Sequence, residues 1–315
     1  MTVEGSDSVQ RDAHGSAEFG HVPVLSKEAI DFLAVQRGGT YIDATVGLGG
    51  HSVLIAKRLG PQGRLTGFDK DARALEIARS RVASPPAERQ GDWPEVKLIH
   101  ASFASVAAHL EPHSADGLIA DVGVSSMQFE DASRGFSFQA DGPLDMRMDT
   151  TQELTAEQVV NQFDERELAD LIYEFGEERS SRRIARAVVR ARPIKTTSQL
   201  ARIVASAVAR PTNPRLHPAT LTFQALRIFV NRELDDLGAL LSAEGARKVL
   251  KKGGRLVVIS FHSLEDRLVK DALREGARRG TWEVLTKKPV VPGEDEVERN
   301  PRSRSARMRA AVKLR

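Results

Sequence analysis

The stretch "TYIDATVGLGGHSVLIAKRLG", residues 40–60, decides the fold. It begins with a short apolar segment, passes through three closely spaced glycines, and continues as a helical pattern from Ser52 to Leu59 that a Gly-Pro pair ends. A strand, a glycine-rich turn and a helix in this order are typical of the first unit of a doubly wound parallel sheet.

Strands and helices keep alternating beyond this stretch. The segments that read as further strands are "GRLTGFD" (63–69), "VKLIHASF" (96–103) and "ADGLIAD" (115–121). The helix expected after the first of them, "DARALEIARSRVA" (71–83), has apolar residues at helical spacing: Ala74, Ile77, Ala78 and Val82. The sequence therefore predicts an α/β fold with a Rossmann-like parallel sheet.

The alternation then stops for about a hundred residues. Residues 121–130, "DVGVSSMQFE", place an acid at the end of the fourth strand and continue without an evident helix signal, so 125–150 reads as a long loop. Helices capped by Asp164, Ser181 and Thr197 follow, then one long amphipathic helix over 220–241.

The sheet resumes with "RLVVISFHS", and 290–309 reads as a charged segment without periodicity. We therefore expect a disordered tail (1–20), a discontinuous sheet domain (21–130 and 218–315) and an inserted helical domain (131–217). Because the insertion leaves from the carboxyl end of a strand, where ligands of open α/β sheets bind, it is placed to cover a substrate.

Composition excludes several classes of protein. The 315 residues contain no cysteine, which rules out disulfides, thiolate nucleophiles and cysteine-ligated zinc and suits the reducing cytoplasm. No apolar run reaches the about 18 residues of a membrane span, and the polar N-terminus is not a signal peptide. Lys and Arg number 46 against 43 Asp and Glu, and the sequence pI of 9.2 leaves room for local basic surfaces.

The glycine turn indicates a nucleoside site. Its order is G-x-G-G, which differs from both G-x-G-x-x-G and the phosphate loop. Asp69 ends the second strand 22 residues after Gly47, where a carboxylate can accept hydrogen bonds from ribose hydroxyls. This pair serves NAD, FAD and S-adenosylmethionine alike.

Three residues favour S-adenosylmethionine among these. Asp43 precedes the turn and could meet a methionine ammonium, or it could cap the turn. Phe103 follows the third strand, where it could pack on an adenine or belong to the core. Asp121 ends the fourth strand, where the chemistry occurs in methyltransferases of this fold, and an acid after "GLIA" cannot be buried without partners.

Longer motifs resemble one family throughout the chain: "YIDATVGLGGHS", "DVGVSSMQF", "RGFSF", "DGPLDMRMD", "FQALRIFVNREL" and "ISFHSLEDRLVK". They are similar to the RsmH (MraW) family and extend from about His21 to Arg309. The resemblance implies a class I methyltransferase fold with an inserted helical domain. It also implies transfer of a methyl group from S-adenosylmethionine to N4 of cytosine 1402, in the usual rRNA numbering, within 16S rRNA of the small ribosomal subunit.

The same resemblance implies a set of cofactor contacts. They are Gly49, Gly50 and His51 at the turn, Asp69 on the ribose, Phe103 by the adenine, and Asp121 and Gln128 in the pocket wall. Gly47 and Asp43 are further candidates. The chain departs from the family only in its polar tail and in the loop "PPAERQGDWP", and neither touches a motif.

Methylation of a cytosine amine requires the amine, the methyl carbon and the sulfur in line, at about 3–3.5 Å. A group must also accept the hydrogens of the amine. Many amino-methyltransferases use an Asp/Asn-Pro-Pro-aromatic loop, but this chain has "DVGVSS". We expect Asp121 to be the catalytic acceptor, with a backbone carbonyl near Gly123 or Val124 as the alternative, and no metal or nucleophile is required.

The RNA must also be held and its base extracted. Phe136 and Phe138 could stack on the base or pin the loop, and Asp145 with Arg147 could read its edge or form an internal ion pair. His262 lies at the active edge and could instead be structural. Two arginine groups could bind phosphates or face solvent: Arg182, Arg183, Arg186 and Arg190, and Arg302, Arg304, Arg307 and Arg309.

Other classes of function stay open from the residues alone. A nicotinamide dehydrogenase would use the same sheet but a different glycine order. A non-catalytic ribosome-assembly factor would keep the fold, and a methyltransferase of another RNA or of DNA would keep the cofactor site. The expected helix over 220–241 could pack inside one chain or across a homodimer.

Overall fold

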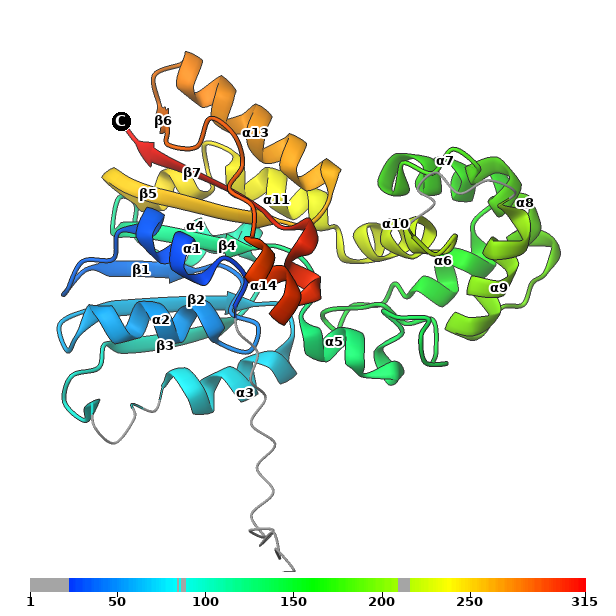
Figure 1. Ribbon diagram of the computed structural model, residues 1–315, viewed down its shortest axis with the longest axis horizontal. Helices are drawn as coiled ribbons and strands as arrows, with labels where there is room; N and C mark the ends of the chain where they lie inside the picture. Colours follow the sequence, from blue (N-terminus) through cyan, green and yellow to red (C-terminus); the bar gives the residue numbers. More distant parts are fainter. Residues whose placement is uncertain (1–22, 84, 86–88, 209–215) are drawn as a thin grey trace, which may run out of the picture.

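A computed structural model describes residues 23–83, 85, 89–208 and 216–315, so the tail predicted at 1–20 lies outside the described residues. Figure 1 shows a layered body built on one sheet and a separate group of helices at its side. No helix in the described part of the chain is long and apolar enough to cross a membrane.

The sheet has seven strands in the order β3-β2-β1-β4-β5-β7-β6. Their bounds are β1 Thr40–Asp43, β2 Arg64–Asp69, β3 Glu95–His100, β4 Ala115–Asp121, β5 Leu250–Ser260, β6 Trp282–Val284 and β7 Arg307–Lys313. The first five are parallel neighbours, whereas β7 runs antiparallel between β5 and β6. The predicted doubly wound α/β fold is thus confirmed.

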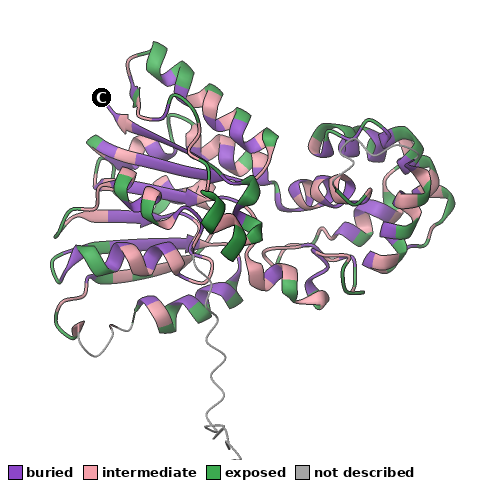
Figure 2. Ribbon diagram, in the orientation of Figure 1, coloured by how far each residue is buried: buried purple, intermediate pink, exposed green. Residues whose placement is uncertain are grey.

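Helices cover both faces of the sheet, because alternate strand residues point to opposite sides. Ile119 and Val257 pack with α1 (Ser26–Leu33), α2 (Gly50–Leu59) and α3 (Ala72–Val82), while the adjacent Leu118 and Val258 pack on the other face. Helices of that face are α4 (Val106–His109), α11 (Glu233–Leu241), α12 (Ala246–Val249) and α13 (Ser263–Arg278). Figure 2 shows the strands as the buried layer.

The inserted helices have a hydrophobic core of their own. They are α6 (Ala156–Gln162), α7 (Glu165–Gly176), α8 (Ser181–Arg190), α9 (Thr197–Ala207) and α10 (Thr220–Asn231). Phe223 and Leu226 of α10 belong to this core, so packing extends the helical body beyond residue 217.

The expectation of one helix over 220–241 is wrong. Arg232 adopts a left-handed conformation with φ 52° and separates α10 from α11. The two helices belong to different hydrophobic cores: α10 packs in the helical insertion, and Leu237 of α11 packs against the sheet. Both apolar faces are therefore buried within this chain.

Several local predictions are corrected. Asp164 caps α7 as expected, but α8 and α9 start one residue early and have Ser180 and Thr196 as N-caps. In α3 the predicted core residue Ile77 is 37% exposed, and Leu75 is buried in its place. The N-cap is the residue just outside the first helical turn, so a helix that starts one residue early has its cap one residue early as well. In α3, the buried face is set by the 3.6-residue period of the helix, and it includes Leu75 rather than Ile77.

Two segments predicted as irregular are ordered. The loop at 125–150 contains α5 (Ser126–Glu130) and η3 (Ala132–Arg134), and α5 starts with a reciprocal Ser125–Gln128 capping box. The C-terminal segment forms α14 (Glu294–Arg299), η4 (Pro301–Ser305) and β7. Strand β7 was not predicted, because arginines interrupt its apolar residues and it has no long continuous apolar run.

Candidate active site

A cavity of about 160 Å³ lies at the carboxyl ends of the parallel strands. The register brings these ends together, because Asp43 pairs with Ile119 and Asp121 pairs with Ile259. The predicted residues that line the cavity are Gly47, Gly50, His51, Asp69, Phe103, Asp121, Gln128 and Arg302, together with Gly123 and Val124, whose carbonyls are the alternative acceptors.

Asp69 ties the second strand to the glycine turn. Its Oδ2 accepts a hydrogen bond from the Gly47 N–H at 2.7 Å, and its Oδ1 accepts one from Asp71 N–H at 2.8 Å. Each carboxylate oxygen has a second lone pair, so ribose hydroxyls can still donate to it. Burial raises the pKa of Asp69 to about 6, and the two backbone N–H groups oppose that rise.

Gly49 has a packing role that the resemblance did not indicate. It is the N-cap of α2 with φ 85°, and a Cβ there would lie 2.6 Å from Cγ2 of Val82 on α3. Gly49 is not among the described residues that line the cavity, whereas Gly50 is. The third glycine therefore lines the cavity, and the second allows the two helices to pack closely.

Asp43 lies behind the turn rather than in the cavity. It is 1% exposed and accepts hydrogen bonds from the Ser52 hydroxyl at 2.6 Å and from Thr45 N–H at 3.1 Å. Burial raises its pKa, and these hydrogen bonds oppose the rise. The arrangement favours the turn-capping interpretation over contact with a ligand ammonium.

Asp121 and His51 lie next to each other in the lining of the cavity. Oδ2 of Asp121 lies 3.5 Å from Nε2 of His51, whose side chain is 5% exposed. Within the described residues, the buried Oδ1 of Asp121 and both ring nitrogens of His51 have no hydrogen-bond partner. Burial lowers the pKa of His51, but the nearby carboxylates of Asp121 and Asp43 outweigh it and the net pKa is raised.

A buried polar network builds the wall beside these groups. Gln128 lines the cavity and donates from Nε2 to Oδ2 of Asp71 at 2.8 Å, while its Oε1 accepts Ser125 N–H at 3.0 Å. The Arg134 guanidinium donates to the same Asp71 oxygen at 2.8 Å and to the carbonyls of Arg147 and Met148. The segment after β4 is thus fixed to the sheet body.

The predicted base-contacting residues lie apart from this cavity. Phe136 is 4% exposed within the helical core, and Phe138 packs on Phe223 with ring centroids 4.9 Å apart. Asp145 and Arg147 form a bidentate ion pair, with N···O distances of 2.9 and 2.8 Å. These contacts favour the alternative interpretations of a pinned loop and an internal ion pair.

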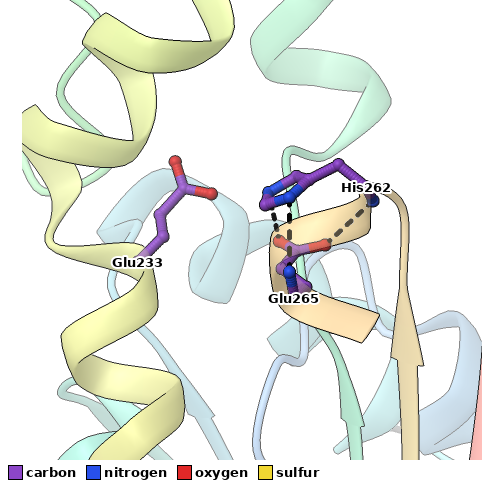
Figure 3. Close-up of side chains that lie close together, drawn as sticks. All are labelled: Glu233, His262 and Glu265. Atoms are coloured by element: carbon purple, nitrogen blue, oxygen red, sulfur yellow. Dashed lines mark hydrogen bonds and ion pairs between the residues drawn. The ribbon is translucent and has the colours of Figure 1, made fainter. Parts of the chain in front are cut away.

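His262 has structural contacts near the cavity. It is the N-cap of α13, and its Nδ1 accepts the Glu265 N–H at 3.4 Å. Figure 3 shows Glu233 of α11 reaching toward His262 and Glu265, with one ligand atom of each lying within 4.8 Å of the others. Two nitrogens of Arg227 already bind both oxygens of Glu233, at 2.8 and 2.9 Å, so this carboxylate has a cationic partner within the chain.

The arginine groups differ in exposure. All four α8 arginines are exposed, while Ile184 and Val188 of that helix are buried. Arg302 and Arg304 are exposed, and Arg302 pairs with Glu130 at 3.2 Å. Arg309 is 7% exposed and binds Asp266 at 2.7 Å, which removes it from any phosphate-binding surface.

Among the described cavity-lining residues that the sequence did not single out are Phe261, Glu233 and Glu265. Phe261 directly follows the last residue of β5, so it lies at the same sheet edge as Asp121. That placement is a signal in the sequence, as it is for the adjacent His262. Glu233 carried no such signal, because it was expected inside a continuous helix.

The lining residues fit a nucleoside that bears an amino-acid tail. Phe103 offers an aromatic surface, Asp69 offers acceptors for two hydroxyls, and the backbone of the glycine turn leaves room for close approach. Beyond them, the unpaired Oδ1 of Asp121 and ring nitrogens of His51 offer hydrogen-bonding capacity to a charged tail. S-adenosylmethionine has this set of groups.

Comparison with known proteins gives consistent matches over nearly the full length. A family model described as the MraW methylase family matches residues 18–314. The chain is 63% identical over 310 residues to "Ribosomal RNA small subunit methyltransferase H" of Koribacter versatilis, covering 98% of each chain. The protein of that name in Acidobacterium capsulatum is 62% identical, with 93% of this chain and 98% of the relative covered. A solved structure described as a putative rRNA-methylase from Clostridium thermocellum superposes with TM-score 0.43 and 11% identity, covering 93% of this chain and 96% of that one.

Proposed function

Because this chain belongs to the MraW methylase family, we propose that it methylates 16S rRNA of the small ribosomal subunit, using S-adenosylmethionine as the methyl donor. The target is the exocyclic N4 amine of a cytosine, position 1402 in the usual rRNA numbering. The observation that carries the proposal is the Asp121 carboxylate, which lines the cavity at the end of β4 and has a buried oxygen without a hydrogen-bond partner among the described residues.

Different residues of the cavity bind different parts of the methyl donor. Asp69 accepts the ribose hydroxyls, and Phe103 packs on the adenine. Asp121 and His51 lie where the charged tail and the sulfonium come to rest. S-adenosylmethionine supplies a methyl group that its sulfonium has already activated for transfer.

The protein's own contribution to the chemistry is alignment and proton acceptance. The amine nitrogen forms a bond to the methyl carbon while the carbon–sulfur bond breaks. Asp121 accepts the proton that the amine gives up, so no covalent intermediate on the enzyme is needed. Its neighbour His51 lies within ion-pair distance of the carboxylate, with Oδ2 and Nε2 3.5 Å apart.

The helical insertion, predicted at 131–217, recognises the RNA. Support comes from α8, whose exposed face carries Arg182, Arg183, Arg186 and Arg190. Exposed arginines bind phosphates and release counterions, which makes binding dependent on salt. The reaction takes place in the cytoplasm, where small subunits are assembled.

One assay tests the proposal. The protein is incubated with labelled S-adenosylmethionine and small subunits from cells that lack this enzyme, and the label is mapped by nuclease digestion and mass spectrometry. We expect one labelled cytosine, methylated at N4. Label on another RNA or DNA amine would correct the substrate, and bound cofactor without any transfer would indicate a non-catalytic assembly factor.

A further inference from the structure

The cavity has an aromatic ring at each end. Among its described lining residues the phenylalanines are Phe103, which follows β3, and Phe261, which follows β5. Four strand spacings of about 4.8 Å separate β3 from β5 in the sheet order, on the order of 19 Å in all. One base cannot stack on both rings, so the cavity offers platforms for two.

Phe261 lies beside the residue proposed to accept the proton. The β4–β5 register pairs Asp121 with Ile259, and its continuation by two residues brings Gly123 beside Phe261. A Cβ on Gly123 would lie 3.2 Å from Cδ2 of the Phe261 ring. The ring therefore packs against the segment that directly follows Asp121, at the opposite end from the adenine platform.

Two fixed carboxylates, Glu233 and Glu265, also line the cavity, and one oxygen of each lies within 4.8 Å of the other. Arg227 binds both oxygens of Glu233, at 2.8 and 2.9 Å. Oε2 of Glu265 accepts the Phe261 N–H at 2.8 Å, and its Oε1 lies 3.0 Å from Nε2 of His262. These are acceptors held in place, and a carboxylate is a suitable partner for the amino group of a cytosine.

Burial alone raises the pKa of Glu265. Three neighbours lower this pKa: His262, by its hydrogen bond and its charge, the Arg227 guanidinium, and the Phe261 N–H. Together they outweigh burial, so the net pKa of Glu265 is lowered. The carboxylate therefore stays ionised and acts only as an acceptor across the physiological pH range.

From these contacts we infer that Phe261, Glu233 and Glu265 form the subsite for the extracted target base. The Phe261 ring stacks on the base, and Glu233 and Glu265 offer acceptors for one N–H of its amino group while Asp121 accepts the proton of the other. The inference rests on the proposed function and identifies its base site. Phe261 takes the role that the sequence suggested for Phe136 and Phe138, whose rings pack in the helical body.

A matched pair of variants separates the two aromatic platforms. Phe261→Leu should lower kcat/KM for small subunits by roughly 5- to 150-fold, mainly through KM, the effect expected of one lost base–aromatic stack. Its affinity for S-adenosylhomocysteine, measured by calorimetry, should equal that of the wild type. Phe103→Leu should do the reverse and weaken S-adenosylhomocysteine first. Phe261→Tyr keeps the ring and should restore the wild-type KM.

A readout that needs no turnover keeps this inference separate from the proposed function. The probe is a short RNA with the fluorescent base pyrrolo-cytosine at the target position. Its fluorescence should be quenched when the base stacks on the ring of the wild type or of Phe261→Tyr, and quenched less with Phe261→Leu. Equal quenching with all three, or a Phe261→Leu variant that transfers with the wild-type KM, would overturn the subsite. If Phe261→Leu does not fold, Phe261→Met replaces it. Absence of transfer by the wild type, with quenching intact, would count against the proposed reaction only.

Discussion

The ionisation of Asp69 should control how tightly the cofactor binds. The charged carboxylate accepts hydrogen bonds from ribose hydroxyls more strongly than the protonated acid, and burial raises its pKa to about 6 in the free protein. Since the pKa is raised, the charged fraction falls as the pH falls through 6. Affinity should therefore be lost on the acid side and be nearly complete at neutral pH.

The magnitude follows from that pKa. At pH 5, one unit below a pKa of about 6, roughly one Asp69 in eleven is ionised, whereas nearly all are ionised at pH 7.5. The affinity for S-adenosylhomocysteine should be about tenfold lower at pH 5, which corresponds to about 1.4 kcal/mol. Isothermal titration calorimetry across this range measures it directly.

Asp69→Asn is the matched control for this titration. The variant keeps the size of the side chain and an acceptor oxygen but cannot ionise, so it should bind weakly at every pH and lose the inflection near 6. His51 and Asp43 also have raised pKa values, and any slope left in the variant reports on them. An affinity that is equal at pH 5 and 7.5, or the same slope in Asp69→Asn, would refute the reasoning.

Three further predictions concern catalysis, RNA binding and stability. Asp121→Asn should lower kcat by about 10²- to 10⁴-fold in single-turnover assays while S-adenosylhomocysteine still binds; a near-normal kcat would assign proton acceptance elsewhere. Arg182→Glu with Arg186→Glu should weaken small-subunit binding and flatten its salt dependence, whereas Arg278→Glu on α13 should not; identical salt slopes would exclude α8 from the interface. Arg134→Met should lower the free energy of unfolding by about 3 kcal/mol in urea titrations, because it leaves a buried carboxylate without its cation, and a loss below about 1 kcal/mol would mean that the network tolerates the change.

The sheet edge could be predicted because its signals are local. Strand ends at Asp69 and Asp121 follow from short apolar runs that stop at an acid, and both acids do line the cavity. In a parallel sheet, such ends meet at one edge whatever the tertiary details. The glycine turn can likewise be predicted from its composition. Composition does not indicate which glycine lines the cavity and which packs against a helix.

Other features depended on contacts between distant residues. The break at Arg232 occurs where the chain passes from the helical core to the sheet, and no helix-breaking residue marks it. Burial of Phe136 and the ion pair of Arg309 with Asp266 require knowledge of the packed helices and of β7. The capping box at Ser125 and Gln128, in contrast, is a local Ser-x-x-Gln pattern, and such a pattern is enough to predict the start of a helix.

The most direct test of the account is a structure of the enzyme bound to a small ribosomal subunit together with S-adenosylhomocysteine. We predict that the target cytosine lies out of its stack, with its ring on Phe261 and its amine about 3 Å from the Asp121 carboxylate. A cytosine that stays stacked in the RNA, or an amine held against another part of the chain in a complex with the cofactor site filled, would contradict it.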